Sequence, residues 1–272
     1  MPRVFPAAFV LTCLCLCLGS AASADTLENI KSRGYMIVGL QADDPPFGFV
    51  RPEDGVLAGF DRDISAFIAK KLGVELKLKP VESATGLDML TQGTVDMLAA
   101  GLVHTFEGDE VIDFSLSYFQ NPQGLLVSRG AGITSQADLA GRKVAVLKGG
   151  PTGETGQNPI PESTIVGFER GSSAIAALQK DTVQAVAADM LQLARLRHSA
   201  PDPAELVLIR TSKATQYMGI GLPEDDSDFR DSINRILAEM WTSGRYEEIF
   251  ATWFGPGTGY EMPLTWELEI WQ

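Results

Sequence analysis

The chain has 272 residues, with 35 acidic and 22 basic side chains and a formal net charge of −13. This acidic balance argues against nucleic acid or an anionic lipid surface as a partner. All three cysteines fall within the first 17 residues, so the rest of the chain offers no disulfide, thiolate metal site or cysteine nucleophile.

The first 24 residues have the pattern of a secretory signal. Arg3 precedes an apolar run at 7–18 that is too short to span a bilayer, and an A-x-A cleavage pattern follows at 22–24. We therefore expect cleavage before Asp25 and an exported, periplasmic protein. An uncleaved membrane anchor is the alternative.

The first half of the remaining chain alternates helices and strands, which predicts a parallel sheet with helical crossovers. We expect Asp61 to be the N-cap of one helix and Gly73 to follow the end of that helix. In chain order, the predicted elements lie at 26–33, 35–40, 61–72, 74–81, 86–92, 95–100 and 111–115.

The segment 93–115 contains the first candidate site. Its apolar run at 95–100 has the length of a buried parallel strand, and Gly101 and a polar loop follow it. Ligands of open α/β sheets bind at the carboxyl ends of parallel strands. We therefore expect a binding site at residues 100–108, with a plain connecting loop as the alternative.

The second half repeats the pattern, so two similar α/β units should face a common cleft. A glycine-rich loop at 148–153 has backbone amides that could hold an anion, although it lacks the GxxxxGK[ST] pattern and a simple turn explains it equally well. The predicted elements are at 124–128, 135–139, 142–147, 162–168, 172–180 and 183–189.

The last part of the chain is predicted to return to the first unit. A strand at 217–222 precedes a long amphipathic helix at 228–243, with Ser227 as its N-cap, and a second helix at 246–255. The tail at 256–272 carries Tyr260 and two tryptophans, which is too much apolar area for a free terminus. We expect the tail to pack against the body.

Motifs along the whole chain resemble those of the family 3 extracellular solute-binding proteins, the periplasmic receptors of polar amino-acid ABC importers. They are PPFGF at 45–49, GFDRDI at 59–64, GTVDM at 93–97, DFS at 113–115, DLAGRKV at 138–144, AALQ at 176–179, AVAAD at 185–189 and WFG at 253–255.

The resemblance implies a type II periplasmic-binding fold, in which two α/β lobes joined by a two-crossover hinge close on a ligand. The first lobe would comprise 25–121 and 213–272, and the second 122–212. The implied partners are a small polar solute and the permease of an ABC importer, with no cofactor, no metal and a monomeric state. The implied ligand-binding residues are Asp44, Phe47, Ser83, Ala100, Gly101, Leu102, Gly108, Gly150, Thr152 and Asp189.

Several of these positions depart from the pattern of the family. The arginine that grips a ligand carboxylate is replaced by Gly108, and the aromatic residue that covers the ligand by Ser83. The tyrosine before the Pro-Pro motif is Asp44. Asp189, which in the family pairs with the α-ammonium group of the ligand, is retained. The resemblance therefore implies a site that has kept its cation-binding half and lost its anion-binding half.

Two kinds of ligand fit these departures. One is an atypical amino acid or derivative, whose carboxylate would be held by Arg170, Lys148 or the backbone at 150–153. The other is an amine-like cation, which three acidic residues, Asp43, Asp44 and Asp189, would attract. Some residues also have structural explanations: Asp44 as a turn cap, Asp189 as a helix N-cap, Phe47 as a core residue and His104 as a hydrogen-bonded loop residue.

An enzyme is one alternative to a binding protein. The same fold resembles exported dehydratases that act on prephenate-like or arogenate-like substrates, for which His104, Glu107 and Glu154 are the candidate acids. Two histidines and no cysteine after residue 24 do not supply a nucleophilic triad or a zinc-ligand set. A periplasmic sensor or accessory protein is the third possibility. We expect a binding protein and no catalysis.

Overall fold

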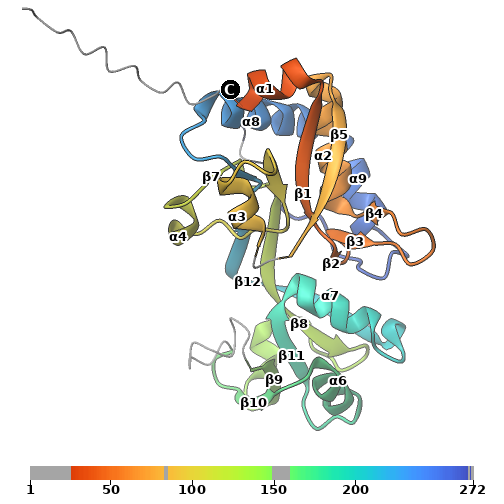
Figure 1. Ribbon diagram of the computed structural model, residues 1–272. Coiled ribbons are helices and arrows are strands. Elements are labelled where there is room, and N and C mark those ends of the chain that lie inside the picture. The colour runs from red at the N-terminus through yellow and green to blue at the C-terminus, as the bar shows by residue number, and fades with distance from the viewer. Residues whose placement is uncertain (1–25, 83–84, 149–159, 269, 271–272) are drawn as a thin grey trace, which may run out of the picture.

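The computed structural model describes residues 26–82, 85–148, 160–268 and 270 (Figure 1). The predicted signal at 1–24 and three predicted site residues, Ser83, Gly150 and Thr152, lie outside the described residues. Within the described part, ten strands form two five-stranded sheets, and three further short strands form a smaller sheet. Each five-stranded sheet belongs to one α/β lobe, as the sequence predicted.

The sheet of the first lobe has the strand order β5-β1-β6-β13-β7. β1 pairs in parallel with β5 and β6, whereas β13 pairs antiparallel with β6 and β7. Its strands are β1 (Tyr35–Gln41), β5 (Glu75–Val81), β6 (Met97–Ala99), β7 (Asp113–Phe114) and β13 (Gly221–Leu222). The accompanying helices are α1 (Thr26–Arg33), α2 (Phe60–Leu72), α3 (Gly86–Thr91), α4 (Phe106–Asp109), α8 (Ser227–Thr242) and α9 (Arg245–Phe254), and the small sheet contains β2 (Asp43–Asp44), β3 (Gly48–Val50) and β4 (Leu57–Ala58).

The sheet of the second lobe has the order β10-β9-β11-β8-β12. β9 pairs in parallel with β10 and β11, and β8 pairs antiparallel with β11 and β12. The strands are β8 (Phe119–Ser128), β9 (Lys143–Leu147), β10 (Thr164–Phe168), β11 (Ala185–Asp189) and β12 (Leu206–Met218). Helices α6 (Gly171–Gln179) and α7 (Met190–His198) and the 3₁₀ helices η1 (Gln136–Leu139) and η2 (Pro203–Glu205) complete it.

Both five-stranded sheets are covered on both faces. In β1 and β6, Val38 and Met97 belong to one apolar cluster, whereas Leu98 belongs to another. In β9, Val144 and Ala145 likewise lie in different clusters. Successive side chains of a strand point to opposite faces. Burial on both faces therefore explains why the sequences of these strands are continuous apolar runs.

β8 and β12 connect the two lobes (Figure 1). They are the longest strands described, and they pair from Leu206 with Ser128 to Met218 with Phe119, with a register shift between Arg210 and Thr215. The predicted strand at 124–128 covers only part of β8, and the predicted strand at 217–222 covers only the last two residues of β12. The two crossing strands form the hinge that the predicted fold requires.

Two helix caps differ from the sequence prediction. Helix α2 is capped by Gly59, and the side chain of Asp61 makes no cap, because the carboxyl group of Asp61 is directed toward other partners. Helix α8 is capped by Asp226, whose Oδ1 accepts a hydrogen bond from the Phe229 N–H at 3.1 Å. Ser227 is therefore the first residue of α8 and not its cap.

Phe47 belongs to the core of the first lobe. It is fully buried and packs edge-on against Phe119 and Phe60, with ring centroids 4.8 Å and 5.9 Å away. The ring of Phe254 lies at 5.7 Å. A ring enclosed in this way presents no surface to a ligand, so the assignment of Phe47 to the binding site is corrected to a core role.

The predicted docking of the tail is confirmed. Met262, Trp266 and Leu268 are 6–7 % exposed and join the same aromatic cluster. The ring of Trp266 lies 5.0 Å from that of Phe119. Among the described residues, none of the helices has both the length and the apolar character needed to cross a membrane.

The core position of Phe47 predicts the effect of shortening it. Phe47→Ala should lower the free energy of unfolding by about 3–5 kcal/mol, because it leaves a cavity in a close-packed cluster. Urea denaturation of the variant and the unaltered protein measures the loss. Phe47→Leu, which keeps most of the volume, is the control and should lose clearly less. An unchanged midpoint in Phe47→Ala would contradict the core assignment.

Candidate functional site

A pocket of about 340 Å³ lies at the carboxyl ends of β1, β5 and β6, where the sequence predicted a binding site. Parallel strands present their following loops at this edge, so residues distant in the sequence meet there. The pocket brings together four predicted site residues, and its lining comprises Gln41, Asp44, Val81, Glu82, Gly86, Leu98, Ala100, Gly101, Leu102 and Val103.

The loop after β6 is fastened to the end of the hinge strand β12. The carbonyl oxygen of Leu102 accepts a hydrogen bond from the Gly219 N–H at 3.0 Å, and the His104 N–H donates to the Tyr217 carbonyl oxygen at 2.8 Å. Gly101 adopts a left-handed conformation with φ = +58°, which a residue without Cβ tolerates best. The loop of the candidate site is thus positioned by the hinge.

Asp61 is a fully buried carboxyl group behind this loop. Its Oδ2 accepts a hydrogen bond from the Gly101 N–H at 3.1 Å, and its Oδ1 accepts one from the Tyr118 hydroxyl at 2.7 Å. Burial raises the pKa of Asp61 to about 7, even though both hydrogen bonds act to lower it, and the neighbouring Asp44 carboxylate adds to the rise. Asp61 therefore holds the loop of the site rather than the start of α2.

Asp44 lies at the rim of the pocket and contacts the second lobe. Its carboxylate forms an ion pair with Arg195 of α7, and the Arg195 Nε–H also donates to the Pro45 carbonyl oxygen at 3.0 Å. Burial raises the pKa of Asp44, while Arg195 acts in the opposite direction and Asp43 adds to the rise. Asp44 thus has a cationic partner within the chain, and the pair links the lobes next to the pocket.

Gly108, at the position of the arginine in the family pattern, lies in α4. Thr105 caps this short helix by accepting a hydrogen bond from the Gly108 N–H at 3.0 Å. A Cβ at Gly108 would lie 2.9–3.0 Å from the ring of Phe114, and that ring stacks on His104 with centroids 4.5 Å apart. An arginine here would have to displace Phe114, so the chain is fitted to a glycine at this position.

Asp189 ends β11 and caps α7. Its Oδ1 accepts hydrogen bonds from the Gln192 N–H at 2.8 Å and from Asn121 Nδ2 at 3.0 Å. The amide oxygen of Asn121 in turn accepts the Leu191 N–H at 3.1 Å. The capping role considered for Asp189 is therefore present. Asp189 does not line the pocket of the first lobe, and it stands on the opposite lobe.

The two basic residues considered as substitutes for the arginine, Lys148 and Arg170, do not line the pocket. Lys148 Nζ lies 2.7 Å from a carboxylate oxygen of Glu169, and both side chains are largely exposed. Arg170 is exposed at the start of α6. Neither residue lines the pocket of the first lobe. Backbone groups at 150–153 lie outside the described residues.

The candidate acids of a dehydratase lie on or beside α4. His104 Nε2 lies 2.8 Å from a carboxylate oxygen of Asp109, and Glu107 is exposed to solvent. Glu154 falls outside the described residues. Within the described part of the chain, no group of three or more histidine, cysteine, aspartate or glutamate side chains is arranged to hold a metal ion.

Sequence reasoning missed Glu82, Gln41 and Arg195. Glu82 directly follows β5 and Gln41 ends β1, so the rule that ligands bind at the carboxyl ends of parallel strands could have identified both. Arg195 reaches Asp44 across 151 positions of sequence. No local signal could have indicated that contact.

The chain matches the family model of the bacterial extracellular solute-binding proteins, family 3, over residues 36–256. It is 33% identical to the ABC transporter glutamine-binding protein GlnH of Bacillus subtilis (strain 168), over 90% of this chain and 93% of the relative. It is 35% identical to a glutamine-binding protein of Geobacillus stearothermophilus, over 79% of this chain and 82% of the relative. The chain belongs to family 3 of the extracellular solute-binding proteins.

Solved structures support the same fold. An ancestral cationic amino acid solute-binding protein superposes with a TM-score of 0.70 at 27% identity, covering 84% of this chain and 99% of that chain. An ancestral cyclohexadienyl dehydratase superposes with a TM-score of 0.68 at 25% identity, covering 85% and 97%. The predicted type II periplasmic-binding fold, with two α/β lobes on a two-strand hinge, is confirmed.

The raised pKa of Asp61 predicts a pH dependence of stability. The unfolded pKa of an aspartate is about 3.9, so between about pH 4 and 7 the folded state binds more protons at Asp61 than the unfolded state does. The contribution of Asp61 to stability is therefore largest at acid pH and falls as the pH rises to about 7.

Asp61→Asn removes this titration. Relative to the unaltered protein, the variant should gain about 2–4 kcal/mol in unfolding free energy between pH 4 and 7.5. Urea denaturation at a series of pH values measures this change, with Asp63→Asn, two residues away in α2, as the control. Parallel pH profiles for Asp61→Asn and the unaltered protein would contradict the prediction.

Proposed function

We propose that this family 3 solute-binding protein captures a small polar solute bearing a cationic amine between its two lobes and delivers it to the permease of an ABC importer. The observation that carries the proposal is the charge of the site. The pocket of the first lobe is lined by the carboxylates of Asp44 and Glu82, and no basic side chain lines it among the described residues.

The two carboxylates of the pocket are not equivalent. Asp44 is neutralised by Arg195, whereas Glu82 is exposed and has no ion pair within the described residues. Across the cleft, Asp189 supplies a third carboxylate at the start of α7. A cationic ligand held between Glu82 and Asp189 would contact both lobes, which is what closure around a ligand requires.

The absence of the family's anion-binding arginine supports the same proposal. Gly108 offers no guanidinium group, and Phe114 occupies the space that an arginine side chain would enter. A ligand carboxylate enclosed without a cationic partner would lose much of its solvation free energy. We therefore favour an amine whose carboxylate is absent or modified over an unmodified α-amino acid.

The names of the relatives support a solute of this general class. They are described as binding glutamine, cystine, arginine, or glutamate and aspartate, and each of these amino acids carries an α-ammonium group at neutral pH. The shared element is the amine, and the residue that would hold it here is Asp189. The acidic ligands are the ones that the charge of this pocket disfavours.

We infer that the protein is exported to the periplasm by a cleaved signal at 1–24, acts as a monomer and has no catalytic activity. The curated relatives are named as binding proteins. His104 is engaged with Asp109 and Glu107 is exposed, so neither is held beside the pocket as a buried acid would be. The lobe boundaries that we propose remain those near 121 and 212, within the two hinge strands.

A thermal-shift screen of the purified protein tests the ligand class. The panel contains diamines, quaternary ammonium compounds, amino-acid amides and free α-amino acids. An amine without a carboxylate, at a hundredfold excess over its dissociation constant, should stabilise the fold by about 2.7 kcal/mol. If only unmodified α-amino acids raise the melting temperature, another group replaces the arginine and the proposal is wrong.

Asp189→Asn tests the residue proposed to hold the amine. Asparagine is also a good N-cap, so the variant should fold with little loss of stability but bind the amine about 10- to 100-fold more weakly, because a charge-assisted hydrogen bond is lost. Asp226→Asn, the same change at the cap of α8, is the matched control and should leave affinity unchanged. Equal affinities of Asp189→Asn and the control would remove Asp189 from the site.

Gly108→Arg tests the missing anion-binding half. By restoring a bidentate donor, the variant should gain affinity for free α-amino acids and lose affinity for amines without a carboxylate. Gly108→Gln displaces Phe114 without adding charge and serves as the control. Isothermal titration with one ligand of each kind gives the preference, which should change in the arginine variant and not in the glutamine variant.

A further inference from the structure

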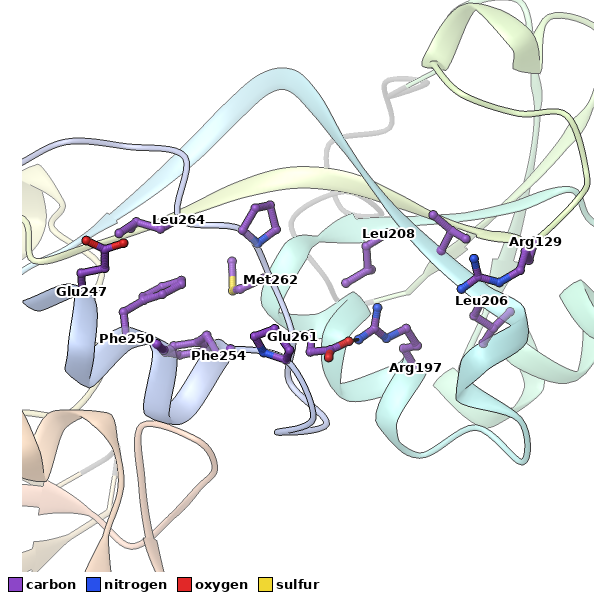
Figure 2. Close-up of a pocket in the computed structure, with 15 residues that line it drawn as sticks. Arg129, Arg197, Leu206, Leu208, Glu247, Phe250, Phe254, Glu261, Met262 and Leu264 are labelled. Atoms are coloured by element: carbon purple, nitrogen blue, oxygen red, sulfur yellow. Dashed lines mark hydrogen bonds and ion pairs between the residues drawn. The ribbon is translucent and has the colours of Figure 1, made fainter.

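The chain after α9 crosses from the first lobe to the second and returns. It leaves α9 at Gly255, and the Met262 N–H donates to the Phe254 carbonyl oxygen at 3.0 Å. Figure 2 shows this segment running between α9 and the end of α7, beside a groove of about 540 Å³ whose walls come from both lobes. We call residues 257–266 the tail strap.

The first part of the tail strap contacts the second lobe. Glu261 Oε2 lies 2.8 Å from Arg197 Nη2 at the end of α7, and the side chain of Arg197 is 15% exposed. The ring of Tyr260 lies 5.0 Å from that of His198. A Cβ at Gly259 would lie 2.2 Å from His198 Nδ1, so the backbone of the strap rests directly on the histidine ring.

The later part of the tail strap is anchored to the first lobe and to the hinge. Trp266 is 7% exposed, and its ring lies 5.0 Å from Phe119 and 5.4 Å from Phe250. The Thr265 carbonyl oxygen accepts a hydrogen bond from Arg210 Nη1 of β12 at 3.1 Å. Because Trp266 is buried among aromatic rings of the first lobe, this residue stays with the first lobe when the lobes rotate.

The tail strap is therefore a further link between the lobes, in addition to the hinge strands β8 and β12 and the Asp44–Arg195 pair. Its contacts with Arg197 and His198 depend on the distance between the end of α7 and α9. A rotation about the hinge changes that distance. Packed contacts of this kind form in the present lobe arrangement and are broken after the lobes rotate.

The arrangement that the strap holds is one in which the ligand site is not closed. The pocket at the carboxyl ends of β1, β5 and β6 is lined by the first lobe alone among the described residues, and Asp189 of the second lobe does not reach it. The ligand must bring the two together. On this basis the contacts of the strap with α7 have to change when the lobes close on a ligand.

We propose that the tail strap is a latch that holds the lobes apart and thereby lowers the affinity for the ligand. The part of this proposal that concerns affinity rests on the proposed function. The Glu261–Arg197 pair and the contact of Gly259 with His198 attach its first part to the second lobe, in addition to the hydrogen bond from Arg210 to Thr265. Loosening either one shifts the ligand-free population toward the closed arrangement, and affinity rises with the fraction of closed molecules.

The lobe separation can be measured without any ligand. Beyond the signal the chain has no cysteine, so the exported protein carrying Lys70→Cys in α2 and Lys180→Cys after α6 accepts one dye on each lobe, and both lysines are exposed. Energy transfer between the dyes is compared in this background, in Glu261→Gln and in Gly259→Ala. Glu248→Gln, which breaks an ion pair within α9, is the matched control.

We expect both strap variants, and not the control, to shift the ligand-free protein toward shorter distances. Affinity for the amine found in the thermal-shift screen should rise about two- to fivefold, the size expected for a partly exposed ion pair. A Glu261→Arg, Arg197→Glu double variant should restore the original distances.

Unchanged ligand-free distances in both Glu261→Gln and Gly259→Ala would overturn the latch. A protein that binds no member of the panel but shows the distance shift would overturn the proposed ligand class and leave the latch standing. A distance shift with lower affinity would show that the strap favours closure, which contradicts the proposed direction.

Discussion

The hydrogen bonds of the Asn121 amide hold the hinge and the ligand site in one arrangement. Asn121 is 2% exposed and lies on the hinge strand β8. Its Nδ2 donates to Asp189 at 3.0 Å and to Gln216 of the other hinge strand at 3.1 Å, and its Oδ1 accepts the Leu191 N–H at 3.1 Å. Buried polar groups must find partners. This single side chain therefore fixes both hinge strands relative to Asp189, the carboxylate that we propose binds the ligand.

The opposite wall of the site is positioned from the same stretch of chain. Tyr118, three residues before Asn121, donates its hydroxyl proton to Asp61, which holds the Gly101 N–H. The hydroxyl of Tyr246 in α9 donates to the Tyr118 carbonyl oxygen at 2.6 Å. The two walls of the cleft thus originate within four residues at the start of β8. A rotation of the lobes about this stretch moves the walls without disturbing either one.

The sequence predicts those features that depend on local pattern and strand order. The apolar runs that form β1, β6, β9 and β11 are short, bounded by turns and buried on both faces. Their sequences therefore predict buried strands. Asp44 and the loop at 100–102 meet because the carboxyl ends of neighbouring parallel strands coincide. The partners of Asp61 lie 40 and 57 positions away, whereas its local surroundings indicated an N-cap. Most of β12 was not predicted, because its strand conformation is stabilised by pairing with β8, some 80–100 positions earlier, and not by a local pattern.

The capping role of Asp189 and its proposed ligand-binding role are compatible for a geometric reason. The hydrogen bonds from Gln192 and Asn121 both go to Oδ1, and a carboxylate has about four acceptor positions on its two oxygens. An ammonium group can therefore bind at Asp189 without displacing the cap or the hinge contact. A ligand carboxylate in the same place would meet Asp189 and Glu82, and the guanidinium of Arg195 beside the pocket is already paired with Asp44. Because the groups that hold Asp189 also hold the hinge, the proposed binding of a cation at Asp189 and the closure of the lobes would depend on the same few hydrogen bonds.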